Sequence, residues 1–275
     1  MMSIKHLLTG GIALASLIGS SAFAADLPSR KFAPVAPVVP VFTWTGFYVG
    51  LNAGASWSHG STGIAAPAAG WFNTINVNGA WRKSEDNVNF TGGAQAGYNY
   101  QTGSFVLGVE TDFNYGSIES KRDGFGRVAF GAFANEQTFS TKTKVEWFGT
   151  LRARVGVTPM ERLMIFGTGG LAYGNVKASA AETDRFLFNG VAVATDSWHG
   201  SKNDTRIGWT LGAGAEYALT NNLSLKAEYL YVDLGKQRYS SIYTGSIPAL
   251  AGTVGARVDH DTKFSIVRAG VNYRF

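Results

Sequence analysis

Apolar and polar residues alternate one by one along several stretches of the chain. In the clearest stretch, 105–115, alternate positions read Phe, Leu, Val, Thr, Phe and Tyr, and the positions between them read Val, Gly, Glu, Asp and Asn. Because successive side chains of a β-strand point to opposite faces, this period of two predicts a strand with one apolar and one polar face. Seven further segments are predicted strands: 47–57, 90–101, 145–157, 163–174, 207–217, 223–231 and 267–275.

The composition of the two faces indicates a membrane barrel. Each segment has roughly the 9–12 residues that a tilted strand needs to cross a bilayer. A soluble barrel such as a lipocalin also alternates, but its interior is apolar, whereas the polar face here holds Gly, Asn, Thr, Gln and charged residues. Both faces are accommodated only if the apolar side chains face lipid outside the barrel and the polar side chains face a polar lumen inside it. We therefore expect an all-β protein, an eight-stranded antiparallel transmembrane β-barrel with up-and-down topology.

The connections between these strands alternate in length. Segments 102–104, 158–162 and 219–222 are short, whereas 58–87, 116–142, 176–204 and 235–262 are long. Short periplasmic turns and long outer loops are typical of outer-membrane barrels, so we expect both termini in the periplasm. Asn189-Gly190 between two apolar runs predicts a type I′ hairpin, and Asn78-Gly79 is a weaker signal of the same kind. The strands are therefore expected to extend above the membrane as ribbons.

Aromatic residues gather at the strand ends, as the two membrane interfaces favour. Those next to short turns are Tyr98, Tyr100, Phe105, Tyr217, Tyr273 and Phe275. Those next to long connections are Trp57, Phe113, Tyr115, Trp147, Trp209, Tyr229 and Tyr231. Aromatics are also good strand formers, which explains their presence but not their position at the ends.

The N-terminal region is typical of an exported protein. Lys5 is followed by an apolar run and by Ala22-Phe23-Ala24, so residues 1–24 are a predicted signal peptide; an uncleaved buried helix is the alternative. Residues 25–43 hold four of the seven prolines and are interpreted as an extended periplasmic segment before a barrel over 44–275. The absence of cysteine excludes disulfides and lipoprotein processing.

Charge is nearly balanced, and alternation places most strand charges in the lumen. Loss of Lys5 with the signal peptide lowers the net charge from +5 to +4, and no single-sign patch indicates nucleic-acid binding. The predicted lumen charges are Glu110, Asp112, Glu146, Arg152, Arg154, Glu216, Lys226, Glu228, Arg268 and Arg274. An eight-stranded barrel is just wide enough for side chains to fill. We interpret these charges as salt bridges that plug the lumen; an ion-conducting constriction is the alternative.

Motifs for catalysis or metal binding are weak. The glycine-rich runs lack the strand–turn–helix context of a phosphate loop, and no His/Cys group has metal-ligand spacing. His59, His199 and His260 all fall in predicted outer loops. His199 with Ser201, or His260 with Asp259 and Asp261, would be the catalytic candidates, and solvated loop histidines are the simpler interpretation. The protein is therefore not expected to be an enzyme.

Several segments together resemble a known family. They are Trp44 to Gly50 (WTGFYVG), Gly167 to Gly174 (GTGGLAYG), Gly208 to Tyr217 (GWTLGAGAEY) and the ending Val271 to Phe275 (VNYRF). In these the chain is similar to the small outer-membrane immunogenic proteins of alphaproteobacteria, a porin-like family of Gram-negative bacteria, and the resemblance covers the whole chain.

The resemblance implies an eight-stranded barrel in the cell outer membrane and the role of a surface antigen that supports the envelope. It also implies that Tyr273 and Phe275 form the signal read by the barrel-assembly machinery. Expected partners are lipid, lipopolysaccharide and host or external ligands of the loops, with no nucleic acid. Some members bind haem, so His59, His199 or His260, near Trp57, Trp71 or Trp198, are the candidate haem contacts. A passive channel for small solutes is the main alternative function.

Overall fold

A computed structural model describes residues 42–59, 62–65, 81–83, 88–244 and 254–275, which lie within the unit Val41–Phe275. The described residues form only strands and their connections, and none of them belongs to a helix that could cross a membrane. The strands are β1 (Gly46–Ser58), β2 (Thr62–Ala65), β3 (Trp81–Lys83), β4 (Asn89–Thr102), β5 (Phe105–Phe130), β6 (Phe133–Met160), β7 (Leu163–Phe188), β8 (Val191–Ala218), β9 (Leu223–Tyr243) and β10 (Val254–Arg274).

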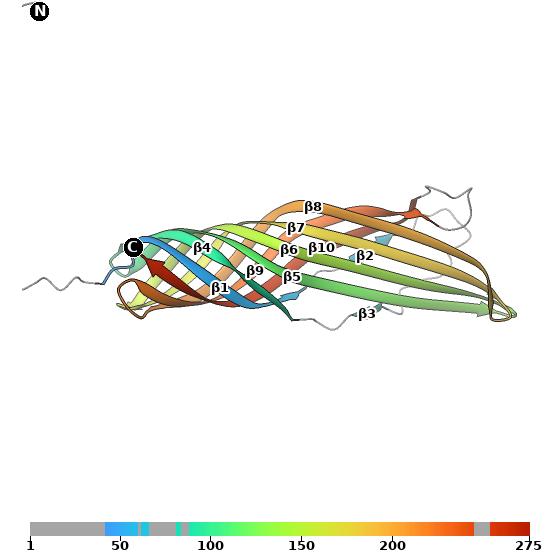
Figure 1. Ribbon diagram of the computed structural model, residues 1–275, viewed down its shortest axis with the longest axis horizontal. Coiled ribbons are helices and arrows are strands. Elements are labelled where there is room, and N and C mark those ends of the chain that lie inside the picture. The colour runs from blue at the N-terminus through green and yellow to red at the C-terminus, as the bar shows by residue number, and fades with distance from the viewer. Residues whose placement is uncertain (1–41, 60–61, 66–80, 84–87, 245–253) are drawn as a thin grey trace, which may run out of the picture. The chain divides into compact units, whose positions relative to one another are not determined.

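Eight of these strands close into a ring in chain order, β1-β4-β5-β6-β7-β8-β9-β10, through an antiparallel β1–β10 pairing (Figure 1). That pairing runs from Tyr48 opposite Arg274 to Ser58 opposite Phe264. The short strands β2 and β3 add to β10 and β5. The ring confirms the predicted eight-stranded antiparallel barrel, and closure satisfies the backbone groups that a sheet edge would expose to lipid.

Strands β5 to β8 continue far beyond the ring, as Figure 1 shows for the ribbons at its right-hand end. Each has 26 or 28 residues, more than twice what a bilayer crossing needs. Most of the predicted loops 116–142 and 176–204 are therefore strand. Asn189 and Gly190 have φ of 46° and 81°, which confirms the type I′ hairpin. Asn78-Gly79 and the predicted signal peptide lie outside the described residues.

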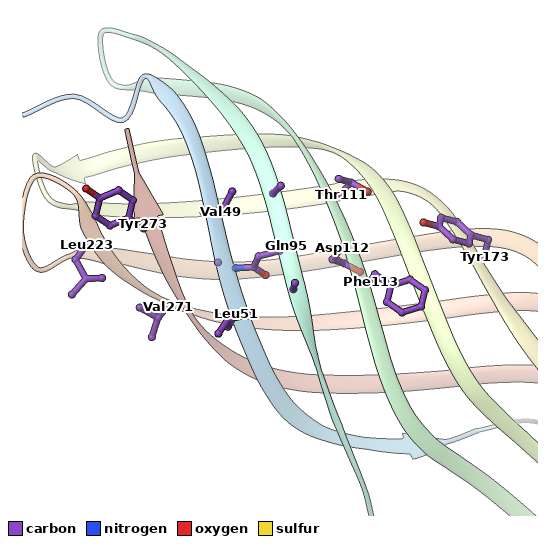
Figure 2. A pocket seen from close by; sticks show the side chains of 13 residues that line it. Val49, Leu51, Gln95, Thr111, Asp112, Phe113, Tyr173, Leu223, Val271 and Tyr273 are labelled. Carbon is purple, nitrogen blue, oxygen red and sulfur yellow. The ribbon is translucent and has the colours of Figure 1, made fainter.

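The outer face of the ring carries the apolar side chains that alternation assigned to lipid. Leu51 is 70% exposed and Phe113 is 50% exposed. Between such side chains lies a hollow of about 640 Å³ whose lining includes the small residues Ala94 and Ala96. Figure 2 shows this region, with Leu51 on β1 and Phe113 on β5. Because its lining is mainly apolar and faces outward, we interpret the hollow as space for acyl chains.

The interior of the ring is layered, which differs from the uniformly polar lumen that alternation indicated. At the end with the short turns, a buried apolar cluster contains Trp44, Val106, Met164, Phe166 and Ala218. At the opposite end, a second cluster contains Ile118, Val145, Phe148, Ala172, Val176, Leu230, Val232, Leu234, Phe264 and Ile266. Buried charges lie between these two clusters. In β9, the alternate positions that face the lumen continue past Tyr231 to Val232 and Leu234, beyond the predicted end of that strand.

Candidate functional site in the barrel lumen

Eight charged side chains form a layer inside the ring. Each is at most 3% exposed: Glu110, Asp112, Arg152, Arg154, Glu216, Lys226, Glu228 and Arg268. Strand register brings opposite charges face to face, since Glu110 lies opposite Arg152 and Glu228 lies opposite Arg268. Four acids and four bases make the layer neutral as a whole.

Arg152 is the centre of this layer. Its guanidinium donates to Glu110, to Glu228 and to Asp112, the last at 2.9 Å. Arg268 donates to Asp112 at 2.9 Å and to Glu228 at 2.8 Å, and so joins the same two carboxylates from β10. Charge-assisted hydrogen bonds of this kind are stronger than neutral ones. The network therefore ties β5, β6, β9 and β10 together across the lumen.

Lys226 and Tyr48 complete the cluster at Glu110. The ammonium of Lys226 lies 2.9 Å from both Glu110 oxygens, and the Tyr48 hydroxyl donates to Glu110 Oε2 at 2.6 Å. Tyr48 fits because its neighbour Gly97 has no side chain: a Cβ there would lie 2.5 Å from the Tyr48 oxygen. Sequence reasoning missed Tyr48, although its position on the polar face of β1 was the available signal.

A second cluster centres on Arg154 and Glu216, whose side chains meet at 2.5 Å. Ser224 and Asn272 also donate to Glu216, at 2.6 and 2.8 Å. Arg154 stacks on the ring of Phe166 at 3.8 Å, while its Nε and Nη1 atoms have no partner. This cluster therefore holds buried donors that water could satisfy.

Glu146 does not lie in the lumen, so that prediction is wrong. The register of β6 shifts between Val145 and Trp147, which reverses the alternation beyond that point. Glu146 consequently faces outward and pairs with Lys177 at 2.9 Å and with Lys144 at 3.7 Å. A single-residue irregularity of this type moves every following side chain to the other face.

Arg274 is buried, but it does not join the carboxylates as expected. Its Nη2 atom donates to the backbone oxygen of Asn221 at 2.8 Å. Its guanidinium lies 4.5 Å from the ring of Phe42 and 5.0 Å from that of Trp44. Cation–π contacts thus take the place of the expected ion pair and hold the segment before β1 against the end of β10.

The three candidate histidines lie apart. His59 Nε2 is 2.9 Å from Ser265 Oγ, and His199 Nδ1 is 3.1 Å from Thr244 Oγ1, while His260 is buried on β10 opposite Gln237. Within the part of the chain that the structure describes, no three His, Cys, Asp or Glu side chains form a metal-binding group. The groove beside His199 is lined by serine, lysine, alanine and glycine, which gives a haem ring no wide apolar wall.

The catalytic pairings that the sequence suggested have little supporting geometry. His199 and Ser201 lie two residues apart on the exposed face of β8, and the His199 Nδ1 atom meets a threonine rather than a carboxylate. Asp259 pairs with Arg238 at 3.0 Å. A general base needs a third group that orients it. The described contacts of His199 do not include one.

Tyr273 lies on the outer face of β10, and Phe275 directly follows that strand. Tyr273 is 50% exposed and Phe275 is 74% exposed, and their rings meet edge to face at 5.3 Å. Both thus remain accessible beside the short turns of the barrel.

Comparison with known proteins agrees with this architecture. Residues 11–275 match the family model described as outer membrane protein beta-barrel domain. The 31 kDa outer-membrane immunogenic protein of Brucella melitensis is 40% identical over 264 residues, which are 95% of this chain and 97% of that protein. The 22 kDa outer membrane protein of Rhizobium leguminosarum bv. viciae is 30% identical over 204 residues, 74% of this chain and 71% of its own length.

Solved structures of other barrels are similar only at low identity. Neisserial surface protein A aligns with 84% of this chain and 98% of its own, at 15% identity and a TM-score of 0.36. The attachment invasion locus protein of Yersinia pestis aligns with 82% of this chain and 99% of its own, at 13% identity and a TM-score of 0.32.

Proposed function

Since this chain belongs to the outer membrane protein β-barrel domain family, we propose that it is a structural and interaction protein of the cell envelope whose lumen is closed to solutes. The barrel anchors the chain in the outer membrane, and the extended strands present its surface to lipopolysaccharide and to external partners. Relatives in Brucella are named for their immunogenicity, which supports exposure of this surface outside the cell.

The observation that carries the proposal is the neutral charge layer between two apolar layers. The ion pairs hold these charged side chains in place, because leaving one charge of a buried pair without its partner costs about 3–5 kcal/mol. Beyond it, Phe148 and Phe264 meet at 5.3 Å within the outer apolar cluster. A solute would have to break the ion pairs and also pass both apolar layers.

A passive channel for small solutes is the second candidate. It is favoured by buried polar atoms without partners, namely Arg154 Nε and Nη1, Asn52 Oδ1 and Asn99 Oδ1. Such atoms attract water, and a continuous file of water would conduct ions. The argument against such a file is the outer apolar cluster, where Phe148 packs against Phe264.

Single-channel recording separates the two functions. The mature chain is refolded, its fold is checked by the mobility shift of a heated against an unheated sample, and it is inserted in a planar bilayer. We expect no steady openings, because the lumen is filled. Steady openings of solute-passing size, comparable with those of a general diffusion porin recorded in parallel, would establish the channel and refute the plugged barrel.

A further inference from the structure

Four lysines of the extended strands gather on one outward face near the membrane. The lysine patch consists of Lys121 on β5, Lys142 and Lys144 on β6 and Lys177 on β7. Strand register forms two adjacent rows: Glu119–Lys144–Lys177–Asn203 and Lys121–Lys142–Ser179–Ser201. The four lysine side chains are between 34% and 50% exposed. They therefore present their ammonium groups to the surroundings.

Neighbouring carboxylates neutralise most, but not all, of this charge. Glu119 binds Lys121 at 2.8 Å and Lys142 at 3.2 Å, and Glu146 is shared by Lys144 and Lys177. The hydrogen bond from Lys121 lowers the pKa of Glu119, and that from Lys177 lowers the pKa of Glu146, so both stay ionised. Asp123, two residues after Lys121 on the same face of β5 and opposite the groove residue Ser140, adds a third carboxylate. Four ammonium groups over three carboxylates leave one positive charge on this face.

A polar groove borders the patch. It has a volume of about 350 Å³, and its lining comprises Ser140, Lys142, Ser179, Ala180, Ala181, His199, Gly200 and Ser201. His199 Nδ1 contacts Thr244, which holds the imidazole in place at the rim. Hydroxyl and ammonium donors around a small concave space suit the oxygens of a phosphate group.

The height of the patch relative to the membrane identifies its ligand. Trp147 lies opposite both Tyr115 and Asn175, and Tyr115 is 71% exposed. Such outward aromatics mark the membrane interface. Lys177 follows Asn175 by two residues, about 7 Å along the strand. The lysines therefore lie at the level of the lipid headgroups and not at the distant tip of the ribbons.

We propose that this face of β5 to β8 binds the phosphate groups of an anionic glycolipid of the outer leaflet, of the lipopolysaccharide type. The lysine patch supplies the net positive charge, and the serine-lined groove beside it receives a phosphate or its sugar. This inference deepens the proposed function and rests on the outer-membrane location alone. It does not require a closed lumen, so conductance and lipid binding can fail independently.

The variant that tests the patch is Lys142→Gln with Lys177→Gln. Each glutamate keeps one lysine partner after these substitutions, because Lys121 still pairs with Glu119 and Lys144 still pairs with Glu146. Neither carboxylate is therefore left without a cationic partner. The matched control is Lys202→Gln with Lys236→Gln, which removes two other exposed lysines that pair with Asp204 and Asp261. Both variants change the net charge by the same amount.

The full mature chain is refolded in phosphatidylcholine nanodiscs and titrated with fluorescent bisphosphorylated lipid A. One basic residue near an anionic surface contributes about a fivefold change in affinity, so the patch variant should bind roughly thirtyfold more weakly. The control variant should bind like the wild type, and added salt should weaken wild-type binding.

Three outcomes would overturn the proposal. The first is equal binding by the patch variant and the wild type. The second is equal binding of dephosphorylated lipid A, which would mean recognition of acyl chains alone. The third is complete displacement by inorganic phosphate at a concentration similar to that of lipid A, which would make the groove a site for free phosphate.

Discussion

At the scale of single residues, carboxylates occupy two kinds of buried environment. Those in the lumen have cationic partners within hydrogen-bond distance, as Glu110 has in Arg152 and Lys226. Asp184, near the tip of β7, has none among its described contacts and is only 6% exposed. It lies between Gln137 on β6 and Asp196 on β8, and its Oδ1 atom has no hydrogen-bond partner. Burial, and then the charges of Glu182 and Asp196, raise its pKa to about 7.

This raised pKa predicts a tip that is more stable in acid. A carboxyl group whose pKa is higher in the folded state stabilises that state while protonated, and the stabilisation is lost as the pH rises from the ordinary value near 4 through about 7. We expect hydrogen exchange in residues 182–198 to be slower at about pH 5 than at about pH 8, after correction for the intrinsic rate. Asp184→Asn should remove most of this difference.

Asp204→Asn is the control for that measurement, since Asp204 is exposed and pairs with Lys202. An unchanged pH dependence in Asp184→Asn would show that Asp184 is not the titrating group.

At the scale of elements, the β7–β8 hairpin depends on a two-residue turn. Gly190 has a φ of 81°, a conformation that a β-branched residue adopts only with strain. Gly190→Val should therefore destabilise the hairpin tip by about 1 kcal/mol or more. We expect faster hydrogen exchange next to the turn and no change in the barrel strands, because the turn lies far from the ring.

Ala192→Val is the matched comparison for the turn, because Ala192 is exposed and lies in β8, outside the two residues of positive φ. If both valine variants exchanged at the wild-type rate, the turn would not be the element that organises this hairpin.

At the scale of the whole molecule, the ring and its extension have separate cores. The extension has its own buried cluster, Phe139, Ala178, Ala180, Tyr239 and Val258, distinct from the two clusters of the ring. The charge layer and the β1–β10 closure lie entirely within the ring. The barrel should thus fold without the outer part of β7 and β8.

A shortened chain tests this independence. Residues 179–201 are replaced by Asn-Gly, which joins Ala178 to Lys202, two residues that already lie opposite each other. We expect the variant to refold and to keep the heat-dependent gel mobility of the wild type. A variant that never reaches the folded mobility would show that the extension contributes to assembly.

How much could be predicted from the sequence depended on the range of the interactions. The eight strands, their closure and the hairpin at Asn189-Gly190 follow from alternation and turn chemistry, which are properties of neighbouring residues. Alternation also assigned Glu110, Arg152, Glu228 and Arg268 to the polar face. The same rule placed Glu146 wrongly, because a register shift in β6 leaves no clear mark in the sequence.

The sequence by itself determined that this chain forms a lipid-facing barrel with a polar inner face, since alternate residues of a strand form its two faces. Only the tertiary structure decided which inward residues meet. It placed Arg152 among three carboxylates from β5 and β9, gave Arg274 aromatic partners, and set apolar layers on both sides of the charges. These contacts join residues far apart in the chain. The stagger of the strands in the closed ring sets the level of each residue in the lumen, and no local sequence pattern encodes that stagger.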